Sequence, residues 1–216
     1  MKKDLTELVF IVDKSGSMSG LEADTIGGFN AMLKKQKKEE GDVFVTTVLF
    51  SDKYELLHDR ITLKGVSPLT DNDYQVGGMT ALLDAIGSTI QKIDNIQKRT
   101  SNEERADRVL FVITTDGIEN ASCEYHAEQV KKMIKKQKEK FNWEFIFLGA
   151  NIDALATAEK FGIEKDFAVN YHADEKGTTV NYEAVSEAVI SYRQGHKLNK
   201  AWKQQIEKDF ETRKRS

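Results

Sequence analysis

The sequence predicts an α/β protein with a doubly wound, mostly parallel six-stranded sheet, one antiparallel edge strand and helices on both faces. Two observations predict this fold. Apolar runs such as Leu8–Val12 and Val109–Ile113 are continuous rather than alternating, as in strands that are buried on both faces of a parallel sheet. Segments with helical periodicity alternate with these runs along the chain, which is the order of elements in a doubly wound fold.

The first half of the chain is expected to contain three strands and two helices. The strands are expected at 5–12, 43–50 and 54–61, and the helices at 21–39 and 81–97. The tight connection at 51–53 requires the second and third strands to be antiparallel. Ser19 and Glu22 have the spacing of a capping box at the start of the first helix.

Residues 64–79 show no clear periodicity and contain the only proline, Pro68. A loop of this length in a compact domain is usually functional or mobile. It leads to Thr80, and four of its residues are candidates for a rim that a partner would meet: Asp71, Asp73, Tyr74 and Gln75. An ordinary solvated loop explains each of these four residues about as well.

The second half is expected to contain strands at 108–115, 143–148 and 166–171, and helices at 124–140 and 154–161. Helical sequence continues from His172. A stripe of apolar residues then recurs every four positions, at Leu198, Trp202, Ile206 and Phe210. We therefore expect a domain over 1–194 and an amphipathic helical extension over 195–216. The extension either docks on the domain or binds a partner.

The composition excludes several classes of protein. A net charge of −3 over 216 residues argues against a dedicated nucleic-acid binder. A single cysteine forms no internal disulfide, and no apolar run has the length of a membrane span. No charged-then-apolar leader precedes the first strand, so we expect a cytoplasmic protein without membrane contact. The four histidines lack metal-ligand spacing and are expected in surface or loop positions: His58, His126, His172 and His196.

Three oxygen-bearing residues follow the first strand at alternate positions: Asp13, Ser15 and Ser17. Alternate side chains of such a loop can converge on one point, and Gly16 allows the loop to bend. Hard oxygen ligands suit Mg²⁺, Mn²⁺ or Ca²⁺ rather than zinc or copper. The structural alternative is that Asp13 only ends the strand and a serine caps the helix.

Two later segments place oxygen side chains at corresponding positions. Gly77-Gly78 leads into Thr80 just before a helix, and the strand at 108–115 runs into Asp116-Gly117. Taken alone, Thr80 is an ordinary helix cap and Asp-Gly is a common turn. Taken together, the three segments each put an oxygen ligand where a strand ends and a helix begins. In an open α/β sheet, this edge is where sites are found.

The order Asp-x-Ser-x-Ser, then Thr, then Asp resembles the complete metal-ion-dependent adhesion site (MIDAS) of the von Willebrand factor A (VWA) family, of the intracellular bacterial type. The resemblance runs from about Leu5 to about Tyr192. It implies the Rossmann-like fold of that family, with its antiparallel edge strand. It also implies a divalent cation, Mg²⁺ first with Mn²⁺ or Ca²⁺ as alternatives, held by Asp13, Ser15, Ser17, Thr80 and Asp116, with at least one aspartate acting through water.

A metal held by three hydroxyls and two aspartates keeps an open position, which an Asp or Glu of a protein partner can fill. We therefore expect a binding module, an adaptor or regulator, rather than an enzyme. One alternative is a metal-dependent hydrolase, for which only Glu119 or Asp73 is placed to act as the base. Glu119 is otherwise an additional ligand, a rim residue or the start of the next helix. The other alternative is a scaffold that acts through its C-terminal helix. The sequence does not indicate the oligomeric state.

Overall fold

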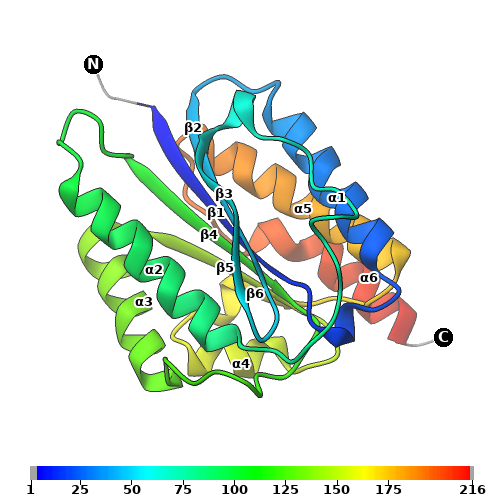
Figure 1. The fold of residues 1–216 in the computed structure, drawn as a ribbon. Coiled ribbons are helices and arrows are strands. Elements are labelled where there is room, and N and C mark those ends of the chain that lie inside the picture. Colours follow the sequence, from blue (N-terminus) through cyan, green and yellow to red (C-terminus); the bar gives the residue numbers. More distant parts are fainter. Residues whose placement is uncertain (1–3, 215–216) are drawn as a thin grey trace.

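A six-stranded sheet forms the centre of the computed structural model, which describes residues 4–214 (Figure 1). The strands lie in the order β3-β2-β1-β4-β5-β6, and every neighbouring pair is parallel except β2 and β3. This confirms the fold class expected from the sequence. The strands are β1 (Leu5–Asp13), β2 (Asp42–Phe50), β3 (Tyr54–Thr62), β4 (Arg108–Thr115), β5 (Glu144–Gly149) and β6 (Ala168–Asn170).

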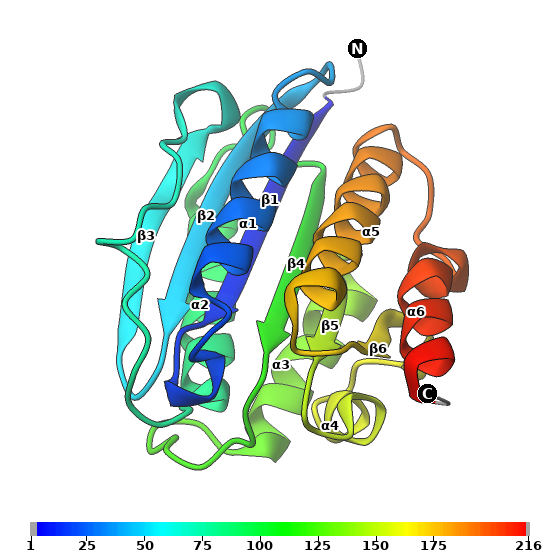
Figure 2. The ribbon, with the colours of Figure 1, turned by 90° about the vertical axis from the view of Figure 1, so that its right-hand side faces the viewer.

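Helices cover both faces of the sheet (Figure 2). One face carries α1 (Glu22–Gln36), α5 (Glu175–Arg193) and α6 (Gln204–Lys214). The other face carries α2 (Leu82–Arg99), α3 (Ala127–Phe141) and α4 (Ala154–Lys160). None of the helices within residues 4–214 combines the length and the apolar character needed to cross a membrane.

The central strand β1 shows why the apolar runs are continuous. Leu8, Phe10 and Val12 point into the layer beneath α1 and α5, whereas Val9 and Ile11 point into the layer beneath α2. All five side chains are at most 2% exposed. Burying a side chain of this size contributes about 1.5–3 kcal/mol, so the apolar side chains on both faces of the strand stabilise the fold.

The start of α1 differs from expectation. The helix begins at Glu22, and its N-cap position is Leu21. The expected capping box of Ser19 and Glu22 is wrong, because the Glu22 carboxylate accepts a hydrogen bond from the Gly20 N–H at 2.7 Å instead. A short 3₁₀ turn, η1 (Gly16–Met18), leaves Ser19 in an extended conformation before the helix starts.

Two other elements are shorter than the sequence suggests. The helix α3 begins at Ala127 rather than near 124 because the Asp84 carboxylate accepts hydrogen bonds from the backbone N–H groups of 123–125 and holds them in a turn. The strand β6 contains only Ala168–Asn170, since the preceding Lys165–Phe167 forms a 3₁₀ turn, η3. The first difference comes from hydrogen bonds between segments 39 to 41 residues apart, and the second from a local 3₁₀ turn; residue periodicity reports neither.

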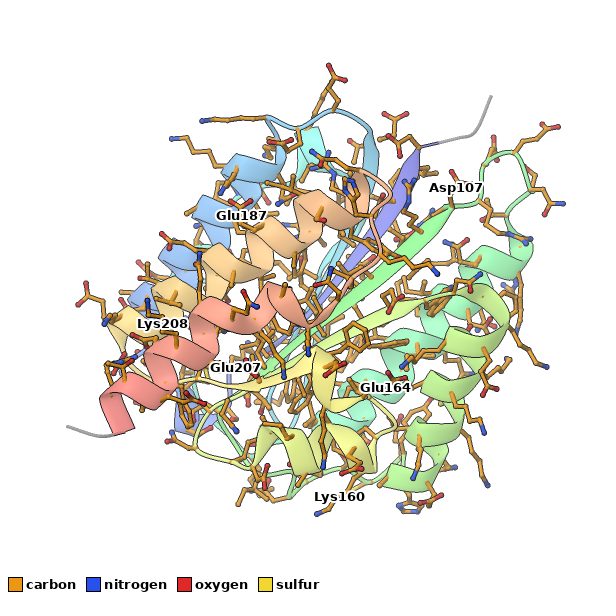
Figure 3. All side chains as sticks on the ribbon, turned by 180° about the vertical axis from the view of Figure 1, so that it is seen from behind. Asp107, Lys160, Glu164, Glu187, Glu207 and Lys208 are labelled. Carbon is orange, nitrogen blue, oxygen red and sulfur yellow. The ribbon has the colours of Figure 1, made fainter. Side chains whose placement is uncertain are left out.

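The C-terminal segment docks on the domain. Leu198 and Ile206 of the apolar stripe are buried, and the Trp202 indole N–H donates to the Asp166 carbonyl at 3.0 Å. The 3₁₀ turn η4 (Lys200–Lys203) leads into α6, which lies along α5. Glu207 and Lys208 of α6 are labelled in Figure 3. Docking is therefore the outcome that the structure shows. The division of the chain at residue 194 stays a prediction.

One histidine is not where the sequence analysis expected it. His58 lies in β3 and is 3% exposed. Its Nδ1 is 3.0 Å from Thr47 Oγ1, and its Nε2 is 3.3 Å from Ser67 Oγ. The expectation of a surface or loop position is wrong for His58 because the chain that follows β3 folds back over it. Burial lowers the pKa of this imidazole.

Candidate metal centre

The five residues of the expected site come from loops that meet at the carboxyl edge of the sheet, at the bottom of Figure 2. Asp13 is the last residue of β1, and Asp116 follows β4 directly. Ser15 precedes η1, Ser17 lies within it, and Thr80 stands just before α2. Because β1 and β4 are neighbouring parallel strands, their ends bring both aspartates to one place.

The three hydroxyls gather around Gly117. A methyl group at Gly117 would lie 2.7 Å from Thr80 Oγ1, 3.0 Å from Ser17 Oγ and 3.5 Å from Ser15 Oγ. The two serine oxygens are themselves 3.0 Å apart. The space beside Gly117 is therefore lined by hydroxyl oxygens, and even the smallest side chain at this position would fill it. The sequence pattern predicts Asp116 as a ligand but indicates no role for Gly117 beyond a turn.

The two carboxylates are buried and held by neutral donors. Asp13 is 0% exposed and accepts from Ser15 N–H at 2.7 Å and from Thr115 Oγ1 at 2.6 Å. Asp116 is 3% exposed and accepts from the side-chain amide of Asn151. The sequence pattern does not indicate this role for Thr115 or Asn151. Their positions at the ends of β4 and β5 were the signal that could have identified them.

Burial raises the pKa of both carboxyl groups. It raises the pKa of Asp13 above its usual range, against the hydrogen bonds from Ser15 and Thr115. It raises the pKa of Asp116 to about 6, where the Asn151 hydrogen bond opposes it and the negative charge of Asp13 adds to it. Within residues 4–214, neither aspartate forms an ion pair with a lysine or arginine. In this part of the chain, the charge of these two groups is thus left without a cationic partner.

Backbone hydrogen bonds fasten the loops of the site to each other. Gly16 N–H donates to the Gly78 carbonyl at 3.0 Å, and Gly77 N–H donates to the Lys14 carbonyl at 2.9 Å. On the other side, Asn120 N–H donates to the Thr80 carbonyl at 3.0 Å, while Thr80 N–H donates to Asn120 Oδ1 at 2.9 Å. The position of Thr80 is therefore fixed from both neighbouring loops.

Glu119 has a structural role that the sequence analysis did not include. Its carboxylate accepts from Leu83 N–H at 2.9 Å, which caps α2, and from Ala121 N–H at 3.1 Å. It also accepts from the N–H and the hydroxyl of Ser122, both at 2.8 Å. Of the alternatives considered for Glu119, the start of the next helix is wrong, because α3 begins at Ala127. A carboxylate with four donors anchors its loop to α2.

Tyr74 is not a rim residue. It is 2% exposed, and its hydroxyl donates to the Asp13 carbonyl. This hydrogen bond holds the 64–79 loop against the end of β1, so the loop stabilises the position of Asp13. Asp73, the other candidate base, accepts from Thr70 N–H at 3.0 Å and from the Thr70 hydroxyl. Asp71 and Gln75 are exposed, as expected of a rim.

The arrangement fits a hard divalent cation. All side-chain donors around Gly117 are oxygens, and the two nearby carboxylates have raised pKa values that a positive charge would lower. Oxygen ligands are those that Mg²⁺ and Ca²⁺ prefer. No group of three or more His, Cys, Asp or Glu residues suited to a metal occurs in 4–214. A site here therefore depends on the hydroxyls of Ser15, Ser17 and Thr80.

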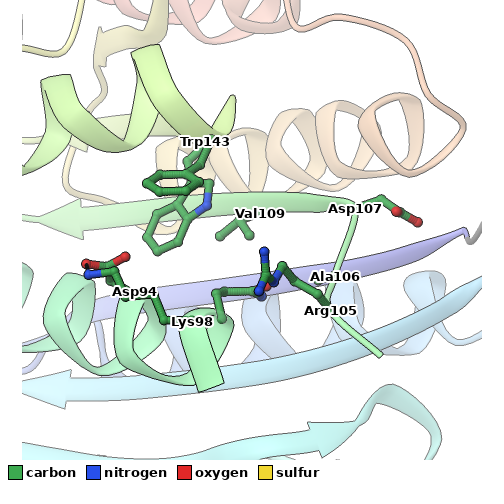
Figure 4. Close-up of a pocket in the computed structure, with 9 residues that line it drawn as sticks. Asp94, Lys98, Arg105, Ala106, Asp107, Val109 and Trp143 are labelled. Carbon is green, nitrogen blue, oxygen red and sulfur yellow. Dashed lines mark hydrogen bonds and ion pairs between the residues drawn. The ribbon is translucent and has the colours of Figure 1, made fainter. Parts of the chain in front are cut away.

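A small cavity of about 80 Å³ lies at the opposite, amino edge of the sheet (Figure 4). It lies between Lys98 at the end of α2, Val109 at the start of β4 and Trp143 just before β5. Asp94 also lines it, but this carboxylate is paired with Lys98 at 2.6 Å and Lys136 at 3.2 Å. The cavity is remote from the five motif residues and shares none of them.

Comparison with solved structures shows the same fold in other proteins. Proximal thread matrix protein 1 from the mussel byssus matches with a TM-score of 0.58 and 12% identity, over 86% of this chain and 46% of that one. A von Willebrand factor type A protein from Catenulispora acidiphila matches with a TM-score of 0.56 and 12% identity, over 88% of this chain and 44% of that one. The ArnB paralog VWA2 from Sulfolobus acidocaldarius matches with a TM-score of 0.51 and 17% identity, over 88% of this chain and 45% of that one. This chain spans less than half the length of these three structures.

A further structure of the mussel protein is described as having a zinc-occupied MIDAS motif, and it matches with a TM-score of 0.55 and 11% identity over 86% of this chain and 46% of that one. At such identities the likeness concerns the fold. The chain thus has the von Willebrand factor A fold, with its mostly parallel sheet and antiparallel edge strand. No protein-family model and no curated protein matches the sequence.

Proposed function

We propose that this protein is a metal-dependent protein-interaction module with a MIDAS. Asp13, Ser15, Ser17, Thr80 and Asp116 would hold a divalent cation, Mg²⁺ in the first place, and a partner protein would add an Asp or Glu carboxylate. The observation that carries the proposal is the gathering of three hydroxyls around the space beside Gly117, next to two buried carboxylates. A bound cation would supply an electrophilic centre with a position open to the incoming carboxylate.

The charge balance supports an anionic partner. Two aspartates neutralise a dication, and the three hydroxyls add no charge. The centre would therefore not repel a third carboxylate. The N-terminus of α2 directly follows Thr80, and the partial positive charge of a helix N-terminus favours anions nearby.

The hydrolase alternative has less support because both candidate bases are engaged. The Glu119 carboxylate accepts four hydrogen bonds from its loop and α2. Asp73 is bonded to Thr70. A general base has to reach the proton that it removes, and freeing either carboxylate would release the turn that it holds. We therefore propose a binding module rather than an enzyme.

The scaffold alternative also has less support. It needs the apolar stripe of the C-terminal helix to be available to a partner, but Leu198 is 9% exposed and Ile206 is 1% exposed. The carboxyl edge of the sheet is then the better candidate for the interaction. We propose an intracellular adaptor or regulator, in keeping with a chain whose single cysteine, Cys123, forms no disulfide.

The test is calorimetric titration of Mg²⁺, Mn²⁺ and Ca²⁺ into chelator-treated protein. Ser17→Ala and Ser19→Ala form a matched pair, since both serines are exposed but only Ser17 contacts the hydroxyl cluster. We expect saturable binding that Ser17→Ala weakens and Ser19→Ala leaves unchanged. The titrations are repeated with acetate present, which can occupy the open position. Equal affinities for the two variants, or no binding with acetate present, would contradict the proposal.

A further inference from the structure

Two large apolar side chains stand exposed beside the metal centre. Met79 is 57% exposed and directly precedes Thr80. Ile118 is 71% exposed and stands two residues after Asp116. These are the two most exposed large hydrophobic side chains in residues 4–214. The others reach at most 42%, at Phe141.

The loops that carry Met79 and Ile118 are joined to each other. Asn120 forms hydrogen bonds with both the N–H and the carbonyl of Thr80. Gly117 packs so closely that a methyl group there would lie 2.7 Å from Thr80 Oγ1. Met79 and Ile118 therefore extend from two loops that are hydrogen-bonded to each other, and each lies within two residues of a residue expected to hold the metal. A partner that reached the metal would meet both side chains.

Charged groups around the centre exclude a strongly acidic partner. The segments 13–21, 77–84 and 116–124 contain five acidic residues and one lysine. That lysine, Lys14, is 7% exposed and is paired with Glu55 at 2.7 Å. Even with a bound dication these segments keep a net negative charge. The neighbouring 51–53 turn, whose Ser51 carbonyl accepts a hydrogen bond from Ala81 N–H, adds one acid, Asp52, and one exposed lysine, Lys53, so the balance is unchanged. Additional acids on a partner would be repelled.

From the exposed pair and this charge distribution, we infer that the site selects a single Asp or Glu flanked by uncharged aliphatic residues. Met79 and Ile118 form the specificity-determining surface. This inference rests on the proposed function, because the carboxylate itself needs the metal. It goes further by naming the neighbours of that carboxylate. Apolar contact at exposed positions contributes in proportion to the area covered, and partial cover of two side chains corresponds to about tenfold in affinity.

The probes are four capped tripeptides: acetyl-Leu-Asp-Leu-amide, acetyl-Gly-Asp-Gly-amide, acetyl-Glu-Asp-Glu-amide and acetyl-Leu-Asn-Leu-amide. Each is titrated into the ¹⁵N-labelled full chain with saturating Mg²⁺ or Mg²⁺ plus chelator, and binding is followed by amide chemical shifts, which report millimolar affinities. We expect Leu-Asp-Leu to bind about tenfold more tightly than Gly-Asp-Gly, Glu-Asp-Glu to bind most weakly of the three acidic peptides, and Leu-Asn-Leu not to bind.

A matched pair of variants locates the preference. Ile118→Ser should reduce the advantage of Leu-Asp-Leu over Gly-Asp-Gly to about threefold or less. Ile61→Ser makes the same substitution at another exposed isoleucine, in the part of β3 that pairs with Val45 near the start of β2, and should leave the advantage intact. Equal affinity of Leu-Asp-Leu and Gly-Asp-Gly in the native chain, or tightest binding of Glu-Asp-Glu, would overturn the inference while leaving the metal-bridged carboxylate in place. Absence of Mg²⁺-dependent binding by all acidic peptides would overturn both.

Discussion

Glu7 and Asp13 are two buried acids on one strand, and they differ in how their charge is compensated. Both are 0% exposed, and burial raises the pKa of both carboxyl groups. Near the amino end of β1, Arg60 Nε lies 2.8 Å from the Glu7 carboxylate. At the carboxyl end, Asp13 has only neutral donors, from Ser15 and Thr115. The chain supplies the cation for Glu7 itself, whereas no lysine or arginine within residues 4–214 forms an ion pair with Asp13 or Asp116.

The arginine that pairs with Glu7 is held in an unusual position. Arg60 has a φ of +49°, which is uncommon for a residue with a side chain, and its guanidinium lies 4.5 Å from the centre of the Phe44 ring. The pairing of β3 with β2 is also irregular in register between Ile61 and His58, the part of β3 that contains Arg60. The fold thus accepts local strain to compensate one buried acid, and it makes no comparable arrangement at the other end of β1.

The largest expected effect comes from breaking the compensated pair. Arg60→Met leaves the buried Glu7 charge without a partner, which should lower the free energy of unfolding by about 4 kcal/mol at pH 8. Urea denaturation followed by circular dichroism measures it. In the control, the double variant Glu7→Gln, Arg60→Met should recover more than half of the loss, because no charge remains. A loss equally large in the double variant would mean that Arg60 acts through packing on Phe44.

Glu7 should also make stability depend on pH. Its folded pKa is about 7 against a usual value of 4.5, so folding favours the protonated form. Its ionisation therefore destabilises the protein progressively as the pH rises from about 4.5 to about 7, by up to about 3 kcal/mol. Glu7→Gln should make the decline shallower by this amount, while the contributions of Asp13 and Asp116, whose pKa values are also raised, remain. Unfolding curves at several pH values, without divalent cations, compare the two proteins, and parallel stability profiles would contradict the assignment.

The next effect concerns the uncompensated acid. Asp13→Asn should lower the affinity for Mg²⁺ about 100-fold, since it removes one of two anionic ligands, while Glu7→Gln should leave the affinity within about twofold. Without metal, Asp13→Asn should not destabilise the protein, because the substitution removes a buried charge that has no ion pair. Calorimetric titration and thermal unfolding of both variants test this contrast. Similar metal affinities in the two variants would remove the distinction between the ends of β1.

The smallest expected effect comes from filling the space among the hydroxyls. Gly117→Ala would place a methyl group 2.7 Å from Thr80 Oγ1 and should lower the Mg²⁺ affinity about tenfold by displacing that oxygen. Gly27→Ala serves as control because a methyl group there meets no atom within 4 Å in α1, and alanine is the better helix former. It should keep full affinity. Unchanged binding by Gly117→Ala would show that metal does not occupy this space.

The positions of the five candidate residues could be predicted from the sequence because each stands where a strand ends or a helix begins. A continuous apolar run ends at Asp13, another ends at Asp116, and helical periodicity begins after Thr80. Parallel strands then bring these ends together without further information. The residues that hold the carboxylates could not be found in this way. Thr115 and Asn151 meet Asp13 and Asp116 only across the sheet edge, and the space at Gly117 exists only when three loops close around it.

The wrong assignments have a common physical cause. Tyr74 and Glu119 lie in irregular segments and His58 lies in the edge strand β3, where sequence patterns favour exposure. Each is instead held by hydrogen bonds to another element or loop, to Asp13, Leu83 and Thr47 respectively. The prediction that Ser19 caps α1 is wrong for a local reason, because the 3₁₀ turn at Gly16–Met18 delays the start of the helix to Glu22.

The sequence by itself determined the fold class, the parallel strands and the identity of the five oxygen-bearing residues, because periodicity and residue chemistry act along the chain. The tertiary structure alone decided which charges are compensated and which are not. That distinction depends on distances between segments far apart in sequence: Arg60 reaches Glu7 across β2, and no lysine or arginine of residues 4–214 pairs with Asp13 or Asp116. Electrostatic compensation requires contact in space, and only the folded chain brings those contacts about.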